Sequence, residues 1–243
     1  MKLSGFLAGV VMLLVSACGG GGSSATPAGV YLSLGDSVAA GSGASDAGTV
    51  SSAALVARDE GLELVNVAVA GATTADVIEK QLPQVGNAVR GREVALITLS
   101  VGGNDLAALI PNASCQDEPL PASCPLDEAL VGVAERLETI LSRLREAYPD
   151  APIIMLAYPN FFSGTGHVFE GPASRVLPRL GETIRGASSH YDGVRVASPS
   201  FEGRGGELTH VLDERFDPHP NDAGHRLIAE SIESEYGALL RQG

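Results

Sequence analysis

The chain is 243 residues long and strongly acidic, with 16 Lys and Arg residues against 29 Asp and Glu residues and a formal net charge of -13. Nucleic-acid binding depends on a basic surface that meets the phosphates, and no Lys/Arg cluster interrupts this acidic background, so we expect no nucleic-acid partner. Residues 30–243 have the length of one α/β domain, which is enough to bury a core.

The first 17 residues have the pattern of an export signal. Lys2 is followed by an apolar run over residues 3–15, which is too short to span a bilayer as a stable helix. The run ends in Val15-Ser16-Ala17-Cys18, which resembles the lipobox cut by bacterial lipoprotein signal peptidase. We expect residues 1–17 to be removed and Cys18 to become an acylated N-terminus. The alternative is an ordinary secretory signal with a chance cysteine.

Residues 18–29 are rich in Gly and Ser, a composition typical of a flexible tether. Such a segment has a root-mean-square reach of about 18 Å. Two or more acyl chains suffice for stable anchoring, whereas one does not. The sequence therefore predicts an exported protein of the cell envelope, anchored to a membrane through Cys18.

Short apolar runs alternate with helical patterns in the remainder of the chain. Five runs are predicted to be buried strands, at residues 30–34, 64–69, 94–99, 153–157 and 194–197. The clearest helix is predicted from about residue 126 to 148, where Pro149 stops it, and a last helix begins near Asn221. This alternation predicts an α/β fold, a three-layer α/β/α sandwich with a mostly parallel five-stranded sheet of the flavodoxin-like kind.

Residues suited to chemistry follow three of these strands. Open parallel sheets bind ligands beyond the carboxyl ends of their strands. The segments at those positions are Gly35-Asp36-Ser37, Ala70-Gly71-Ala72-Thr73 and Val101-Gly102-Gly103-Asn104-Asp105. Towards the C-terminus, the segment Asp217-Pro218-His219-Pro220-Asn221-Asp222-Ala223-Gly224-His225 adds imidazole and carboxylate groups. A hydroxyl, an amide donor, glycine backbone N–H groups and an imidazole base together predict an acyl-transfer site.

These four segments resemble the four sequence blocks of the GDSL or SGNH hydrolase family, in the family's order. Ser37 matches the nucleophile block, Gly71 the glycine block, Asn104 the asparagine block and His219 the histidine block. Val38 stands where the family name has leucine, and both side chains are apolar. The resemblance implies the SGNH hydrolase fold from about residue 30 to the final helix. It also implies that the chain is an ester hydrolase, either a carboxylesterase or a lipase.

The resemblance also implies roles for these residues. Ser37 attacks the ester carbonyl after His219 accepts its proton. The backbone N–H groups of Ser37 and Gly71, with the side-chain amide of Asn104, form the oxyanion hole. The reaction requires no cofactor and no metal. The expected partner is a small-molecule or lipid ester, and we expect the enzyme to act as a monomer.

The acidic member of the site departs from the family pattern. The family usually places its aspartate three residues before the histidine, a position that Phe216 occupies here, whereas Asp217 is two residues before His219. We predict that Asp217 is the acid. Asp222 and His225 do have the three-residue spacing, but His225 would then be the base and the histidine-block match would be accidental. A backbone carbonyl that orients His219 is the third alternative.

The cysteines and histidines could also serve as structural or metal-binding residues. Cys115 and Cys124 lie in a Pro-rich loop of an exported protein and are predicted to form a disulfide. Metal binding by this pair is the weaker alternative, because no further Cys or His is nearby. A metal site made of Asp217, His219 and His225 has suitable ligands but no further spaced set to support it.

Other polar residues are assigned structural positions. Asp105 is predicted to be a hydrogen-bonding partner within its loop, and His167, His190 and His210 to be surface or loop residues. Loops at residues 111–125, 159–172 and 198–214 are expected to shape substrate preference. Two other functions remain open: an acyltransferase that uses the same site, and a non-catalytic envelope lipoprotein.

Overall fold

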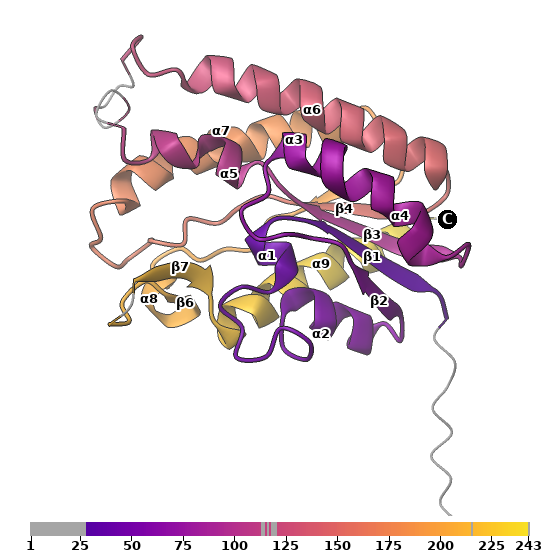
Figure 1. Cartoon of the computed structure of the whole chain (residues 1–243). Helices are drawn as coiled ribbons and strands as arrows, with labels where there is room; N and C mark the ends of the chain where they lie inside the picture. Colours follow the sequence, from indigo (N-terminus) through magenta and orange to yellow (C-terminus); the bar gives the residue numbers. More distant parts are fainter. Residues whose placement is uncertain (1–27, 113–114, 116, 118–120, 215, 243) are drawn as a thin grey trace, which may run out of the picture.

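The computed structural model describes residues 28–112, 115, 117, 121–214 and 216–242. Its centre is a five-stranded parallel sheet with the strand order β2-β1-β3-β4-β5 (Figure 1). The strands are β1 (Val30–Gly35), β2 (Glu63–Asn66), β3 (Val94–Ser100), β4 (Ile153–Leu156) and β5 (Val194–Ala197). The predicted parallel sheet is confirmed. Cys18 and the predicted signal segment lie outside the described residues.

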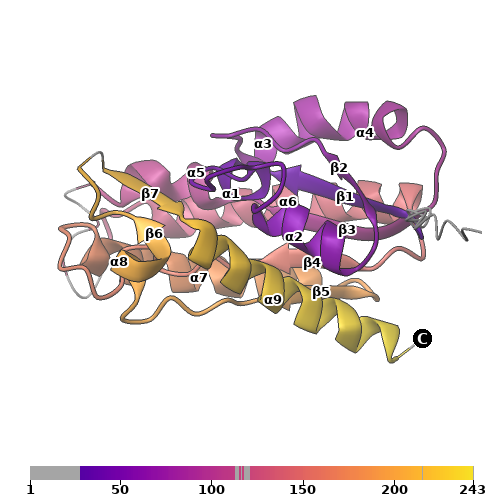
Figure 2. The same ribbon diagram turned by 90° about the horizontal axis from the view of Figure 1, so that it is seen from below.

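Helices cover both faces of this sheet, which confirms the predicted three-layer arrangement (Figures 1 and 2). One face carries α2 (Ser52–Asp59) and α9 (Asp222–Leu240), and the other carries α4 (Leu82–Val89), α6 (Leu126–Ala147) and α7 (Glu170–Ser188). Short helices stand near the strand ends: α1 (Ser37–Ala40), α3 (Thr74–Asp76), α5 (Gly103–Leu106) and α8 (Gly205–Leu208). A π-helical turn (Val77–Gln81) and a 3-10 turn (Ala107–Leu109) complete the helical segments.

The central strands are buried on both faces, as their apolar runs predict. Every residue of β1 is buried, and so is every residue of β3 except Ala95. Helix layers on both sides of a parallel sheet leave no face for solvent, so these strands show no alternation of polar and apolar residues.

The second strand differs from the prediction in both length and burial. It was expected to be buried over residues 64–69, but β2 ends at Asn66 and none of its residues is fully buried. It forms an edge of the sheet, beyond β1. The side chain of Asn66 ends the strand, because its Oδ1 accepts from the N–H of Ala68 at 2.9 Å and its Nδ2 donates to the Ala39 carbonyl at 2.8 Å.

The two predicted helices are present, and α7 is the longest of the helices that were not predicted. α6 buries side chains at helical spacing and ends at Ala147, one residue before the predicted limit. Asn221 is the N-cap of α9, where its side chain accepts from the N–H groups of Ala223 and Gly224. α7 begins inside the segment that was predicted to be a loop, residues 159–172.

A small antiparallel ribbon was also not predicted. It pairs β6 (Thr209–His210) with β7 (Asp217–Pro220), and β7 contacts α1. A residue before proline is restricted to extended conformations, which here applies to both Asp217 and His219. The Asp-Pro-His-Pro segment therefore forms a strand, and Figure 1 shows this ribbon next to α8 and α9.

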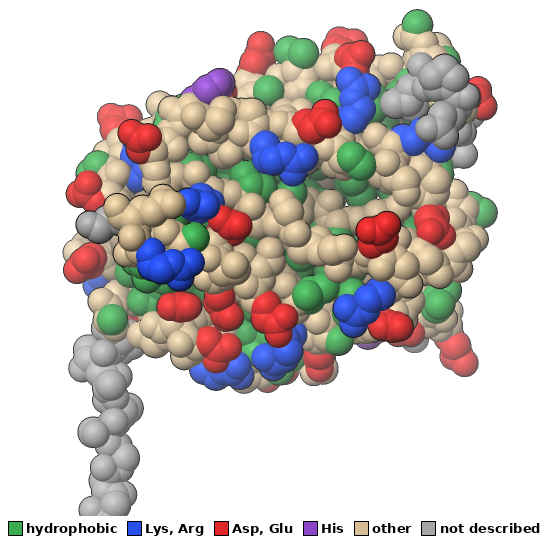
Figure 3. All heavy atoms as spheres, turned by 180° about the vertical axis from the view of Figure 1, so that it is seen from behind, with side chains coloured by type: hydrophobic (Ala, Val, Ile, Leu, Met, Phe, Trp, Pro, Cys, Tyr) green, Lys and Arg blue, Asp and Glu red, His purple; other side chains and the backbone are tan. Residues whose placement is uncertain are grey.

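The loop before α6 contains the predicted disulfide. Cys115 and Cys124 are bonded in the structure, with their Cα atoms 4.9 Å apart. Across the described ranges of the chain, no helix is both long and apolar enough to cross a membrane. On the face seen in Figure 3, acidic and basic side chains are interspersed.

Candidate active site

Ser37 stands where the chain leaves β1 and enters α1. β1 lies between β2 and β3, so its carboxyl end is a topological switch point, the usual ligand site of open α/β sheets. Gly35 makes this exit possible: its φ is 128°, and a Cβ there would lie 1.9 Å from the Ser100 carbonyl oxygen. Ser37 is the first residue of α1 and is half-buried.

The carboxylate before Ser37 is buried and belongs to a polar network that was not predicted from the sequence. Asp36 is only 2% exposed, caps α1 by accepting from the N–H of Val38 at 3.0 Å, and accepts from the hydroxyls of Ser100 and Tyr158. Burial raises the pKa of Asp36 to about 6 against the opposing effect of these hydrogen bonds. An acidic residue directly before a helix is an N-cap signal that could have identified Asp36, whereas nothing local points to Tyr158.

The glycine and asparagine segments meet at the same end of the sheet. Asn104 lies on α5, directly after β3, and its Nδ2 donates to the Ala72 carbonyl at 3.0 Å. Ala72 follows Gly71, which is exposed in the connection between β2 and α3. One proton of the Asn104 amide is therefore used to hold α5 beside Gly71, and the other is left for a ligand.

Asp105 makes structural hydrogen bonds as predicted, but its partners lie on α3 and α6 and not within its own loop. It accepts from the N–H of Thr74 at 2.9 Å and from its hydroxyl at 2.5 Å, and it forms an ion pair with Arg136 of α6 at 3.0 Å. These contacts fasten the segment after β3 to α3 and α6.

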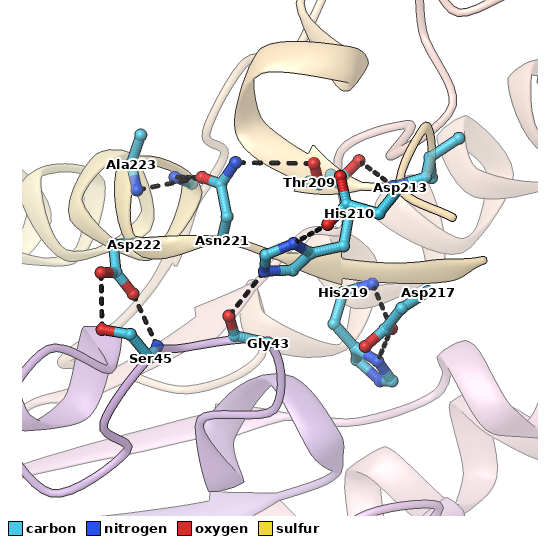
Figure 4. Close-up of polar contacts among 12 residues, drawn as sticks. Gly43, Ser45, Thr209, His210, Asp213, Asp217, His219, Asn221, Asp222 and Ala223 are labelled. Carbon is cyan, nitrogen blue, oxygen red and sulfur yellow. Dashed lines mark hydrogen bonds and ion pairs between the residues drawn. The ribbon is translucent and has the colours of Figure 1, made fainter. Parts of the chain in front are cut away.

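His219 and Asp217 form a bonded pair on β7 (Figure 4). His219 Nδ1 and its backbone N–H both contact Asp217 Oδ1, the latter at 3.0 Å. Side chains two residues apart in a strand project to the same face, so a spacing of two residues places the carboxylate under the imidazole. Burial tends to raise the pKa of Asp217, but the hydrogen bonds and charge of His219 outweigh it and hold that pKa below its usual value.

Phe216, at the position where the family usually has its acid, belongs to a different group of side chains. Its ring stacks on His167, with ring centroids 4.9 Å apart, and lies against Phe162 and Phe169. Phe162, His167, Phe169 and Phe216 form one aromatic cluster, whereas Phe161 and Phe201 form a separate pair with ring centroids 5.6 Å apart.

The structure brings the segments of Ser37 and His219 together. α1, which begins at Ser37, contacts β7, the strand that carries His219. Gly43, shortly after α1, lies so close to β7 that a Cβ there would be 2.9 Å from His219 Cβ and 2.3 Å from the Pro220 carbonyl oxygen. Within the described chain no hydrogen bond joins the Ser37 hydroxyl to His219. Such bonds often form only in the substrate complex.

The alternative base and acid are not supported by the structure. His225 is 0% exposed; its Nδ1 accepts from the Ser52 N–H at 3.2 Å and its Nε2 donates to the Ser42 carbonyl at 2.9 Å. Asp222 instead accepts from the N–H and hydroxyl of Ser45, both at 2.7 Å. The three-residue spacing of Asp222 and His225 is therefore a consequence of helix α9 and does not mark a catalytic pair.

The remaining histidines occupy varied surroundings. His190 follows α7 and pairs with Glu138, and His167 lies in the aromatic cluster. His210 was expected on the surface or in a loop, but it lies in β6 and contacts Gly43. In the part of the chain that the structure describes, no three His, Cys, Asp or Glu side chains are grouped so that they could hold a metal ion.

A parallel α/β/α sheet with these segments at the carboxyl ends of its strands defines the SGNH class of hydrolases. The chain belongs to the GDSL-like lipase/acylhydrolase family, whose model matches residues 33–227. It is therefore an ester hydrolase. Among proteins with curated descriptions, none matches this sequence.

Solved structures share the fold. The phospholipase A1 from Streptomyces albidoflavus is 24% identical, with a TM-score of 0.66 over 85% of this chain and 98% of that one. The extracellular lipase from Streptomyces rimosus is 22% identical, with a TM-score of 0.65 over 84% and 98%. The acetylxylan esterase from Geobacillus stearothermophilus is 18% identical, with a TM-score of 0.53 over 86% and 94%.

Proposed function

We propose that this chain hydrolyses carboxylic esters through an acyl-enzyme formed on Ser37. His219 accepts the proton of the Ser37 hydroxyl, and the oxygen then attacks the ester carbonyl. Asp217 holds the imidazole ring of His219 in one tautomer and stabilises the imidazolium that forms. The protonated His219 returns its proton to the alcohol that leaves, and a water molecule, activated by the same base, releases the acid.

The negative charge of the tetrahedral intermediate needs hydrogen-bond donors that are already in place. The backbone N–H groups of Ser37 and Gly71 and the second proton of the Asn104 amide are proposed to supply them. None of these three donors is used by another hydrogen bond within the described residues. Donors of this kind stabilise the transition state without reorganising during the reaction.

The observation that carries this proposal is the His219–Asp217 pair on β7, next to α1. An imidazole with one nitrogen held by a carboxylate presents its other nitrogen as a base, which is the arrangement a serine nucleophile requires. An acyltransferase would use the same acyl-enzyme with an alcohol in place of water, so the two reactions differ only in the acceptor.

A fluorophosphonate probe tests the proposal directly, because it labels activated serines. The purified chain is expected to be labelled and to hydrolyse p-nitrophenyl acetate. Ser37→Ala is expected to lose both properties, and Ser189→Ala, at an exposed serine directly after α7, to keep the label. Labelling that persists in Ser37→Ala would overturn the assignment of the nucleophile.

The apolar part of the substrate is proposed to lie on an exposed surface beside the site. Val168, Leu212 and Phe216 are 74%, 63% and 50% exposed, and we call them the apolar corner. Phe216 directly precedes Asp217, and its ring stacks on His167, the neighbour of Val168. Leu212 lies near the same loop, because a Cβ on Gly206 would be 2.7 Å from Leu212 and 4.0 Å from Thr165. Large apolar side chains gathered at a surface are typical of a binding site, which favours esters with an apolar acyl group.

Anchoring is a separate part of the proposal. The lipobox-like segment supports acylation of Cys18 and a location in the cell envelope, on a membrane. Expression in a bacterium fed an alkyne-tagged fatty acid is expected to tag the chain and place it in the membrane fraction. A Cys18→Ser variant that still carries the tag would refute the assignment.

A further inference from the structure

The loop that follows α1, residues 41–45, is hydrogen-bonded to the C-terminal segment at Ser42, Gly43 and Ser45. Figure 4 shows the contacts of Gly43 and Ser45. The Ser42 carbonyl accepts from His225 and the Gly43 carbonyl accepts from His210 Nε2, each at 2.9 Å. Ser45 donates to Asp222 through its N–H and its hydroxyl. The segment after Ser37 and the segment that contains His219 are therefore held together by hydrogen bonds in which neither Ser37 nor His219 takes part.

The two histidines in this set are held differently. His225 is buried and accepts a hydrogen bond at Nδ1, so its single proton is on Nε2 and the ring is neutral. Burial also lowers the pKa of His225. His225 is therefore a fixed structural contact that does not change near neutral pH.

His210 faces an acceptor at each ring nitrogen. Its Nε2 contacts the Gly43 carbonyl, and its Nδ1 contacts Asp213 Oδ2 at 2.6 Å. Only the imidazolium carries protons on both nitrogens, so both contacts are hydrogen bonds only when His210 is charged. In the antiparallel ribbon, His210 is also the cross-strand partner of Asp217.

His210 thus contacts both halves of the proposed site. Through β6 it lies beside the strand that carries Asp217 and His219, and through Nε2 it holds Gly43. The loop and β7 are in close contact, because Gly43 packs directly on Pro220 and His219. A loss of the His210 contact would release the loop from β7 on the side of α1.

We propose that His210 is a positioning residue, which holds residues 41–45 against β7 and so sets the separation between Ser37 and His219. This inference rests on the proposed function of that pair. His210 touches none of the reacting atoms. Its effect is on the fraction of molecules in which the serine and the imidazole are correctly placed.

The protonation of His210 then links this contact to pH. The Gly43 carbonyl and Asp213 raise its pKa, and Asp217 adds to the effect. The other titratable groups around it are Asp222 and His225 of α9 and His219 of β7. As pH rises through that raised pKa, His210 keeps a proton on one nitrogen only. The Asp213 carboxylate is a stronger acceptor than a backbone carbonyl, so the proton stays on Nδ1 and the contact with Gly43 is the one lost. The turnover of the wild-type enzyme is therefore expected to fall on the alkaline side.

Three variants of the full chain test the inference with p-nitrophenyl butyrate. His210→Ala is expected to lower kcat about 10- to 100-fold with KM within about twofold, because misplacement of reacting groups by about 1 Å costs up to about 100-fold. His210→Gln keeps a donor for the Gly43 carbonyl and is expected to recover most of kcat near neutral pH. Its kcat should no longer fall on the alkaline side. His190→Gln, an exposed histidine that also pairs with a carboxylate, is the matched control.

The outcomes separate this inference from the proposed function. If Ser37→Ala keeps its activity, the proposed function fails. If Ser37→Ala is inactive but His210→Ala has the kcat of the His190→Gln control, only the positioning role is overturned. It is also overturned if His210→Gln retains the alkaline fall of the wild type. The pH profile of His210→Gln decides the matter even if His210→Ala does not fold.

Discussion

His219 and Asp217 are two residues apart on one strand, and the carboxylate contacts Nδ1 of the imidazole from the same face. The prolines that follow each of them impose the extended backbone that brings the two side chains together. A spacing of three residues, as in the family's usual pattern, would place the acid on the opposite face of such a strand. The strand thus accounts for the departure of this chain from that pattern.

Asp217→Asn is expected to lower kcat strongly, by about 10,000-fold as for the loss of the acid in serine proteases, because the amide favours the wrong tautomer of His219. Asp222→Asn is the matched control, since its side chain can still accept from Ser45, and it should change kcat by less than about threefold. Steady-state hydrolysis of p-nitrophenyl acetate provides the measurement. A large loss only in Asp222→Asn would reverse the assignment.

Asn104→Ala is expected to lower turnover by about 100- to 1000-fold, because it removes one donor to the oxyanion. KM should change little, since the charge develops only in the transition state. The bond from Asn104 to Ala72 is lost as well, so thermal unfolding must be measured beside kcat. Asn87→Ala, on the exposed side of α4, is the control. Near-normal turnover in Asn104→Ala would remove this residue from the oxyanion hole.

Asp36→Asn is expected to remove a pH dependence of stability. The pKa of Asp36 is about 6 in the folded chain, against 3.8 for the unconstrained group. Between these values the folded state retains a proton that the unfolded chain has released, so stability falls as pH rises from about 4 to about 6. A difference of about two pKa units corresponds to about 3 kcal/mol. Urea unfolding at pH 4.5 and 7 should show this loss in the wild type and a smaller one in Asp36→Asn. Equal losses of stability in the two proteins would contradict the assignment of this pH dependence to Asp36.

Changes in the apolar corner are expected to alter chain-length preference. A triple variant with Val168, Leu212 and Phe216 each replaced by serine should lose about three- to tenfold in kcat/KM for p-nitrophenyl octanoate and little for the acetate. The reason is that long acyl chains bury apolar surface at about 25 cal/mol per Å². Val131→Ser, 59% exposed on α6, is the control. An unchanged octanoate-to-acetate ratio would show that the acyl group binds elsewhere.

Much of the fold could be predicted from local patterns in the sequence. The apolar runs of β1 and β3 mark central strands because both faces of a parallel sheet are covered. The periodicity of α6 and the cap at Asn221 mark helices for equally local reasons. The positions of Ser37, Gly71 and Asn104 after successive strands also predict that they share one end of the sheet, because parallel strands all end on the same side.

The tertiary structure alone decided how the acidic residues and histidines divide their roles. Asp217, Asp222, His210 and His225 are of similar residue types within 16 positions of one another, and local sequence does not distinguish them. Their hydrogen-bond partners distinguish them, and these partners are distant in sequence. His210 binds the carbonyl of Gly43, 167 positions away, and His225 binds that of Ser42, 183 positions away. Asp36 likewise lies 122 positions from its partner Tyr158. Periodicity describes how a segment meets its neighbours along the chain, whereas the protonation and hydrogen bonds of a side chain depend on groups that only folding brings to it.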